Sequence, residues 1–475
     1  MRPHRPLLAL AVLLALSGCT AVAPDGGFGA VADATSQRIG VRPQLARDEA
    51  AARALHDTVR AELAGPLGMD AAVRIALINN PGLQASYWKV GIAQAELAQA
   101  SRLHNPTLGF RRVSGGGEVE IERGIGVDLA ALLTTPLAAR MEARRFEAVR
   151  REVGAAIERH ALETRRAWVE AVAARQDLDY ARQVNAAAEA SAELAGRMRR
   201  AGNLASLELA REQLFHAEAA AALARAGRQE IAARETLARL LGLWGQDSAF
   251  TLPERLPELP QAPLELREVE RIALERRLDV QAARADAAAT AAGLGLTRTT
   301  RFVNALELGY AGKSESGSPS ARGYELSLEL PLFDWGGARV ARAEAIYMQA
   351  LQRVAETAVN ARSEARESYL GYRSAYDLAR HYRDTVIPLR KQISREVLLR
   401  YNGMLASTQQ LLADSREQAA AVNAAIAALR EFWIAHANLE AALGGRVGDG
   451  QEPGREQGRD QGKQQDWEQD KEHAE

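Results

Sequence analysis

The stretch of sequence that decides the fold lies at residues 323–330 and reads GYELSLEL. Apolar and polar residues alternate along it, so a β-strand here would have one apolar face and one acidic face. The apolar positions are Tyr324, Leu326, Leu328 and Leu330. A second stretch, 118–129, alternates in the same way with Val119 and Ile121 on its apolar side, and Arg123 is its one break.

Each alternating stretch follows a plausible partner strand. We expect strands at 106–113 and 118–129, and at 302–311 and 322–330, with Gly-rich turns between the members of each pair. Strands of this length can cross a bilayer when tilted. In a soluble protein the apolar faces would instead pack on a core. The helices expected around the hairpins are too long to fold back over them, so we expect these faces to meet lipid. The lipid-facing residues would be Val119, Ile121, Tyr324, Leu326 and Leu328.

The composition favours long helices for the rest of the chain. The 475 residues are 47% apolar, mostly Ala and Leu, and only 5% aromatic. Lys plus Arg number 60 and Asp plus Glu 61, so the chain lacks the basic excess of a dedicated nucleic-acid binder. A single cysteine excludes an intrachain disulfide framework and a multi-cysteine metal site.

The chain contains two copies of one pattern. ALINNPGLQA at 76–85 matches ALERRLDVQA at 273–282, displaced by 197 residues. GNLAS at 202–206 matches GMLAS at 403–407, displaced by 201 residues. Two matches in the same order and at nearly the same displacement predict a tandem duplication.

Within each copy the expected order is a helical segment, a hairpin, a very long helix and a returning helix. The helical segments are predicted at 70–104, 137–201 and 204–241, and again at 265–300, 338–402 and 405–443. The segment 137–201 would reach roughly 100 Å, and a heptad seam from Leu405 to Trp433 predicts lengthwise helix packing. We assign the repeats to 67–250 and 265–445, with a Pro-rich linker at 251–264 and a disordered tail at 446–475.

The N-terminus reads as a secretory signal. Arg2 and Arg5 precede a short apolar run, and LSGC at 16–19 resembles a bacterial lipobox. Residues 1–18 would be removed and Cys19 would be acylated, in a pattern that resembles outer-membrane sorting. The alternative is an ordinary signal peptide with an incidental cysteine. Residues 19–66 are expected to form an extended, lipidated tether.

No pattern for catalysis or cofactor binding is present. The eight histidines are scattered without zinc-ligand spacing, and there is no phosphate-binding loop and no nucleophile elbow. We therefore expect no catalytic residue, no cofactor and no metal site.

Four strands cannot close a barrel, and open sheet edges are not tolerated in lipid. Strands from three chains would give a twelve-stranded barrel with a water-filled lumen. The carboxylates of the strands would face this lumen. The expected fold class is mainly α, with long packed helices and four transmembrane strands per chain.

At this point the chain resembles the TolC-type outer-membrane factor family, over roughly residues 67–444. The resemblance rests on the duplication, on the start at Ala76–Leu83, on LPLFDWGGAR at 330–339 and on the turns at 202–206 and 403–407. The first copy departs from it, because residues 132–137 lack the Phe-Asp-x-Gly-Gly element. Residues 383–445 are similar to members associated with heavy-metal resistance.

The resemblance implies a homotrimeric exit duct of a tripartite efflux or type I secretion system, without catalysis. In the trimer the long helices would form an α-barrel that continues from the twelve-stranded β-barrel into the periplasm. Its partners would be a periplasmic adaptor and, through it, an inner-membrane transporter, and its cargo would be heavy-metal ions or drugs. The family closes its periplasmic mouth just after the turns, which makes Glu208, Gln409 and Gln410 candidate gate residues. Outer-face, solvated positions are the alternative for these three residues. The residues that would meet the adaptor are Gly202, Leu204, Ala205, Ser206, Gly403, Leu405, Ala406 and Ser407.

Two other classes of protein remain in view. A periplasmic adaptor has one coiled-coil hairpin and a β-rich lipoyl-like domain, which a duplicated pattern does not fit. A structural coiled-coil lipoprotein has no need of amphipathic hairpins. Trimers that resist SDS and come from the outer membrane would separate the duct from both.

Overall fold

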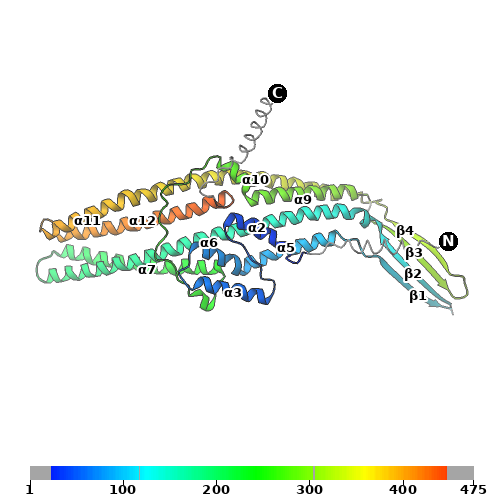
Figure 1. Ribbon diagram of the computed structural model, residues 1–475, viewed down its shortest axis with the longest axis horizontal. Helices are drawn as coiled ribbons and strands as arrows, with labels where there is room; N and C mark the ends of the chain where they lie inside the picture. Colours follow the sequence, from blue (N-terminus) through cyan, green and yellow to red (C-terminus); the bar gives the residue numbers. More distant parts are fainter. Residues whose placement is uncertain (1–22, 117, 303–304, 447–475) are drawn as a thin grey trace, which may run out of the picture.

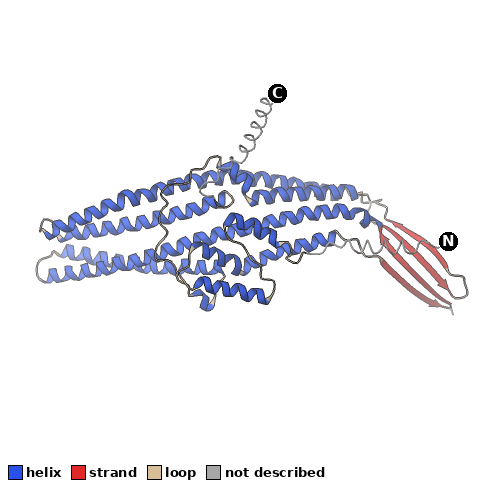
Figure 2. Ribbon diagram, in the orientation of Figure 1, coloured by secondary structure: helices blue, strands red, loops and turns tan. Residues whose placement is uncertain are grey.

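The computed structural model describes residues 23–116, 118–302 and 305–446, which form a long helical body with one small sheet at its end (Figure 1). Figure 2 shows that all four strands lie in this sheet and that the rest is almost entirely helical. The expected fold class is confirmed for the single chain. The predicted signal peptide, Cys19 and the tail beyond Arg446 lie outside the described residues.

The same order of elements occurs twice. The first set consists of α4 (Met69–Asn79), α5 (Pro81–Ala100), β1 (Thr107–Gly115), β2 (Glu118–Asp128), α6 (Leu129–Arg200) and α7 (Ser206–Leu241). The second consists of α8 (Val269–Arg276), α9 (Leu278–Thr300), β3 (Leu306–Glu315), β4 (Ala321–Leu328), α10 (Gly337–His381), α11 (Ile387–Asn402) and α12 (Thr408–Ala442). A π-helical turn at Tyr382–Val386 joins α10 to α11. Each long helix runs alongside the helix that returns from it (Figure 1).

The first helical segment of each copy is divided in two. Asn80 leaves the helical conformation, and its side chain accepts a hydrogen bond from the Leu83 N–H at 3.0 Å, which caps α5. Pro81 then occupies the first helical position, where its missing N–H costs nothing. Arg277 makes the equivalent break between α8 and α9 without a proline.

Helix α6 is longer than the sequence suggested. It spans 72 residues, or roughly 108 Å, and begins at Leu129, eight residues before the expected start. Asp128 caps it by accepting from the Ala131 N–H at 2.8 Å. Pro136 was expected to precede the helix, but it lies in the second turn, where it removes a single backbone hydrogen bond.

The four strands form one antiparallel sheet in the order β1-β2-β3-β4. The second pair differs from the expected ranges. Strand β3 begins four residues late and reaches Glu315, whereas β4 ends at Leu328 instead of 330. Pro331 lacks the N–H that would continue the ladder on that side. Within one chain, β1 and β4 are the unpaired edges.

The tether prediction is wrong for most of the residues from 28 to 63. They form α2 (Phe28–Ile39) and α3 (Glu49–Leu63), which pack on the middle of the body (Figure 1). Phe28 lies with its ring centroid 4.5 Å from that of Tyr87. The apolar spacing of Phe28, Val31 and Ile39 was the available signal, since it places these residues on one helix face.

Three clusters of buried residues hold the middle of the molecule together. The first cluster joins α2 to α5 and α6. The second joins the pair α3 and α4 to the pair α6 and α7. The third joins α10 to α12. The Pro-rich linker packs against this core: Tyr376 donates from its hydroxyl to the Gln261 carbonyl at 2.8 Å, and Trp433 Nε1 donates to the Pro257 carbonyl at 2.9 Å.

Candidate channel site

The sheet has two chemically different faces. Residues opposite one another on neighbouring strands share a face, and the register therefore assigns every strand residue to one side. The five residues predicted to meet lipid all lie on the same face, which also carries Leu108, Phe110, Ile125, Val127, Leu306, Leu308 and Tyr310. None of the described residues forms a layer over this face: Leu326 is 65% exposed and Tyr324 is 85% exposed.

The opposite face carries the acidic residues of the strands. Glu118, Glu120, Glu122, Asp128, Glu307, Glu315 and Glu325 all point to this side. Two cations lie among them. Lys313 pairs with Glu120 at 2.9 Å and Arg111 pairs with Glu122 at 3.6 Å.

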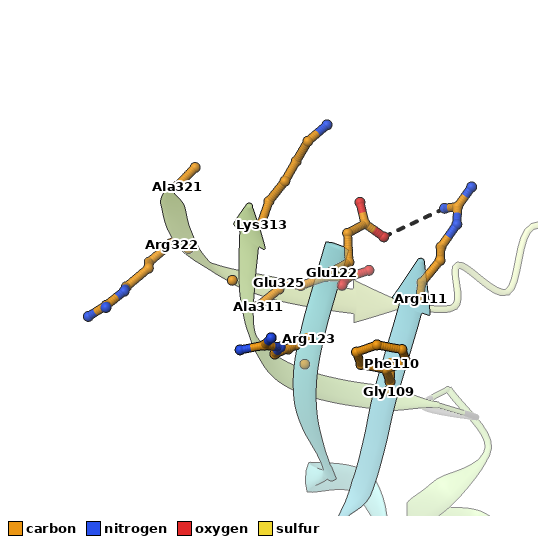
Figure 3. Close-up of a pocket in the computed structure, with 13 residues that line it drawn as sticks. Gly109, Phe110, Arg111, Glu122, Arg123, Ala311, Lys313, Ala321, Arg322 and Glu325 are labelled. Atoms are coloured by element: carbon orange, nitrogen blue, oxygen red, sulfur yellow. Dashed lines mark ion pairs between the residues drawn. The ribbon is translucent and has the colours of Figure 1, made fainter. Parts of the chain in front are cut away.

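A row of small residues crosses the acidic face. Gly109, Gly124, Ala311 and Gly323 are direct neighbours on the four strands. They border a hollow of about 580 Å³ whose rim includes Arg111, Glu122 and Lys313 (Figure 3). Because small residues leave the backbone uncovered, the sheet keeps open space on its acidic side.

Exposed aromatic and aliphatic side chains follow the sheet where it joins the helices. Leu332, Phe333 and Trp335 are 67%, 100% and 62% exposed. The Trp335 ring stands edge-on to Phe302 at a centroid distance of 6.4 Å. Such a collar is typical of the border between lipid and water.

The two turns at the far end of the helices differ in the residue that reverses the chain. Gly202 adopts the left-handed conformation in the first turn, with φ of 79°. In the second turn this conformation falls on Met404, with φ of 60°, and Gly403 has an ordinary φ of −83°. The sequence match aligned Gly202 with Gly403, whereas the left-handed residue of the second turn comes one position later, at Met404. Met404 and Leu405 are 94% and 81% exposed at the tip.

The candidate gate residues lie close to these turns. Glu208 and Gln409 line the same small cavity of about 20 Å³, and Glu208 pairs with Arg211 at 2.9 Å. Gln410 has a local role, because its Oε1 accepts from the Ser407 N–H at 2.9 Å in a capping box.

A buried polar cluster beside this cavity escaped the sequence reasoning. The Glu212 carboxylate accepts from Ser191 Oγ at 2.7 Å and from Arg416 Nη2 at 2.5 Å. Only 6% of Glu212 is exposed, and the Arg416 guanidinium also lies 4.6 Å from the centre of the Phe215 ring. The cluster joins α6 and α7 of the first copy to α12 of the second. Neither helix carries a local sequence pattern that marks this pairing.

Comparison with known proteins gives both relatives and structural neighbours. No family model matches the chain. Protein CyaE of Bordetella pertussis is 30% identical over 322 residues, which cover 61% of this chain and 66% of CyaE. The match thus spans just under two thirds of that relative's length.

Solved outer-membrane channels superpose over most of the chain. The Campylobacter jejuni channel CmeC has a TM-score of 0.67 at 17% identity, covering 81% of this chain and 87% of CmeC. The Neisseria gonorrhoeae channel MtrE, in its open state, has a TM-score of 0.67 at 19% identity, covering 79% and 89%. The channel OprN has a TM-score of 0.66 at 20% identity, covering 87% and 96%.

The chain has the fold of the TolC-type outer-membrane channels. The resemblance drawn from the sequence is confirmed. These structural neighbours are outer-membrane channels.

The middle of this TolC-type body holds the repeats together through buried charges. Arg165, 7% exposed, donates to Glu440 of α12 and to the Ile39 carbonyl of α2. Glu158 lies 3.5 Å from Arg38, and burial raises its pKa to about 7 despite this partner. A nearby carboxylate, Asp279, raises the pKa of Glu158 further.

Other kinds of site are not apparent in the described part of the chain. No helix there is both long enough and apolar enough to cross a bilayer. No group of three or more His, Cys, Asp and Glu side chains within the described ranges is placed to hold a metal ion.

Proposed function

We propose that the protein is an exit duct in the outer membrane of a Gram-negative bacterium. It works as a homotrimer that passively conducts substrate of an efflux or type I secretion system to the outside. A periplasmic adaptor and an inner-membrane transporter deliver the substrate and supply the energy. The observation that carries this proposal is the sheet with one apolar face, one acidic face and two open edges.

The open edges argue for assembly. A sheet with free edges and an uncovered apolar face is unstable both in water and in lipid. Pairing β4 of one chain with β1 of the next would remove every edge and close twelve strands into a barrel. The apolar faces would then meet lipid, and the carboxylates would line a water-filled lumen that favours cations.

The helical body would project into the periplasm, with the turns at 202–206 and 403–407 farthest from the membrane. Exposed Met404 and Leu405 give the second tip an apolar surface suited to an adaptor. Acylation of Cys19 would add a second anchor beside the barrel. The mouth would close near Glu208, Gln409 and Gln410, with the Glu212–Arg416 pair holding the two helix pairs together.

Disulfide cross-linking between edge strands tests the assembly directly. The chain has a single natural cysteine, Cys19, so the introduced pairs are placed in a Cys19→Ser chain, where no other thiol can react. We would fix one cysteine at Gly109 of β1 and scan the luminal positions of β4, Ala321, Gly323 and Glu325, in cells. We expect one register to give a covalent trimer in the outer-membrane fraction, and either cysteine alone to give none. Dimers only, or protein without membrane association, would contradict the proposal.

Recording in planar bilayers separates the duct from the other two classes of protein. A duct should give long-lived, cation-selective conductance. A structural coiled-coil lipoprotein or an adaptor would give no conductance, whatever its oligomeric state.

A further inference from the structure

Three arginines interrupt the apolar face of the sheet at the end far from the helices. Arg123 and Arg322 lie in one row with Phe110 and Gly312, and Arg112 lies in the next row outward. Figure 3 shows Arg123 and Arg322 directed away from the side of the sheet on which Glu122, Lys313 and Arg111 stand. The cations therefore belong to the face that carries Tyr324 and Leu326.

None of the three arginines has an anionic partner within the described chain. Each is exposed, and no ion pair or hydrogen bond of its side chain is formed with the described residues. All strand carboxylates lie on the opposite face, where Arg111 and Lys313 are paired. A neighbouring copy offers no remedy, because the same face of its strands also lacks Asp and Glu.

The height of this row matches a membrane border. Arg322 is eight residues from Leu330, roughly 26 Å along an extended strand, or about 20 Å along the membrane normal at the usual tilt. Together with the collar at Phe333 and Trp335, this gives an apolar band close to the ~25 Å of outer-membrane barrels. Arginine at that height can extend its charged end into the headgroup layer. Ile121 lies in the row of Arg112 and Val119 lies one row beyond it, so these two residues would face lipid headgroups instead of acyl chains.

We propose that Arg112, Arg123 and Arg322 bind the phosphate groups of a phosphorylated glycolipid of the outer leaflet, of the lipid A type. Arginine suits phosphate because its planar guanidinium donates two parallel hydrogen bonds. Arg123 and Arg322 are separated by one intervening strand, roughly 10 Å, so their side chains can reach one phosphate or the two phosphates of one headgroup. The inference rests on the proposed function, which directs this end of the sheet outward.

Lipid titration of the purified trimer tests the inference. The trimer in detergent is titrated with diphosphoryl lipid A, and bound lipid is counted by native mass spectrometry. Each lost arginine–phosphate contact should weaken binding roughly tenfold. We therefore expect Arg123→Gln/Arg322→Gln to bind about 100-fold more weakly. Arg111→Gln, an exposed arginine of β1 on the opposite face, should bind as the wild type does.

Three further arms define the outcome. Lipid A without phosphates should bind weakly to every variant, and inorganic phosphate at equal concentration should not compete. Equal lipid binding by the wild type and the double variant, or an equal loss in Arg111→Gln, would overturn the inference. Conductance is recorded on the same samples. If the wild type and the double variant both form channels and bind lipid A equally, this inference is wrong and the proposed function stands. If the wild type forms no channels, the proposed function is wrong.

Discussion

The sharpest prediction concerns the two faces of β4. Leu326 lies near the middle of the apolar band, opposite Leu308, and 65% of it is exposed in the single chain. An arginine near the bilayer midplane of a barrel costs roughly 2–4 kcal/mol. The trimer contains three copies, so Leu326→Arg should destabilise the assembled barrel by about 6–12 kcal/mol.

The adjacent residue provides the matched control. Ser327 points to the acidic face, directly opposite Glu307, so an arginine there would meet water and a carboxylate. We expect Ser327→Arg to assemble normally and to reduce cation selectivity. The assay is the fraction of SDS-resistant trimer in outer-membrane extracts, followed by conductance measurements. Equal trimer yields for Leu326→Arg and Ser327→Arg would refute the assignment of the faces.

Three other predictions concern the helical body. Met404→Gly removes a left-handed backbone strain and should stabilise the tip by about 1 kcal/mol, seen as slower hydrogen exchange there, whereas Gly202→Ala should speed exchange at the other tip. Glu158 has a folded-state pKa of about 7, above its usual value of 4.5, so its contribution to stability falls as pH rises between these values. Glu158→Gln should therefore raise the free energy of unfolding more at pH 8 than at pH 5, by roughly 3 kcal/mol at most, and this difference is measured as a larger rise in melting temperature at pH 8; an equal change at both pH values would contradict the burial argument. Arg416→Ala leaves Glu212 buried without its cation and should weaken closure of the mouth by about 1.5–3 kcal/mol. The measurement is single-channel conductance, which should rise. Arg211→Ala is the control and should change conductance less, because its partner Glu208 is less buried.

The sequence predicted most of the fold because two periodicities carry it. Alternation at 118–129 and 323–330 located the sheet and its faces, and uninterrupted Ala- and Leu-rich segments located the long helices. The ends of the helices were predicted less well, because they depend on local backbone chemistry. A proline stops a helix in some contexts, as Pro81 does at Asn80, but Pro136 is absorbed within the first turns of α6.

The missed features depend on long-range packing. The segment 28–63 resembles a tether by composition, yet its apolar stripe is buried against Tyr87 and α6. The Glu212–Arg416 contact joins residues 204 positions apart, and nothing in the local pattern of either helix marks the pairing. Candidate gate residues could be placed near the mouth, but the helix phase that buries Glu212 and leaves Gln409 exposed comes only from packing.

The turns also reveal an equivalence that the sequence match obscured. Counted from the left-handed residues Gly202 and Met404, the tenth positions are Glu212 and Asp414, and both carboxylates are buried, at 6% and 8% exposure. Glu212 is satisfied by Ser191 and Arg416, whereas Asp414 Oδ1 has no hydrogen-bond partner in the described chain.

A buried carboxylate oxygen without a partner costs about 1–3 kcal/mol, and this oxygen is already enclosed within one chain, so every protomer carries the cost. Asp414→Ala should therefore raise the thermal stability of both the assembled trimer and the dissociated chain. Glu212→Ala removes a carboxylate whose partners Ser191 and Arg416 lie within the same chain, so it should destabilise both forms. Melting of detergent-solubilised trimer and of the dissociated chain measures both changes. A loss of stability on Asp414→Ala as large as that on Glu212→Ala would contradict the argument, because it would show that the second carboxylate is satisfied as the first one is.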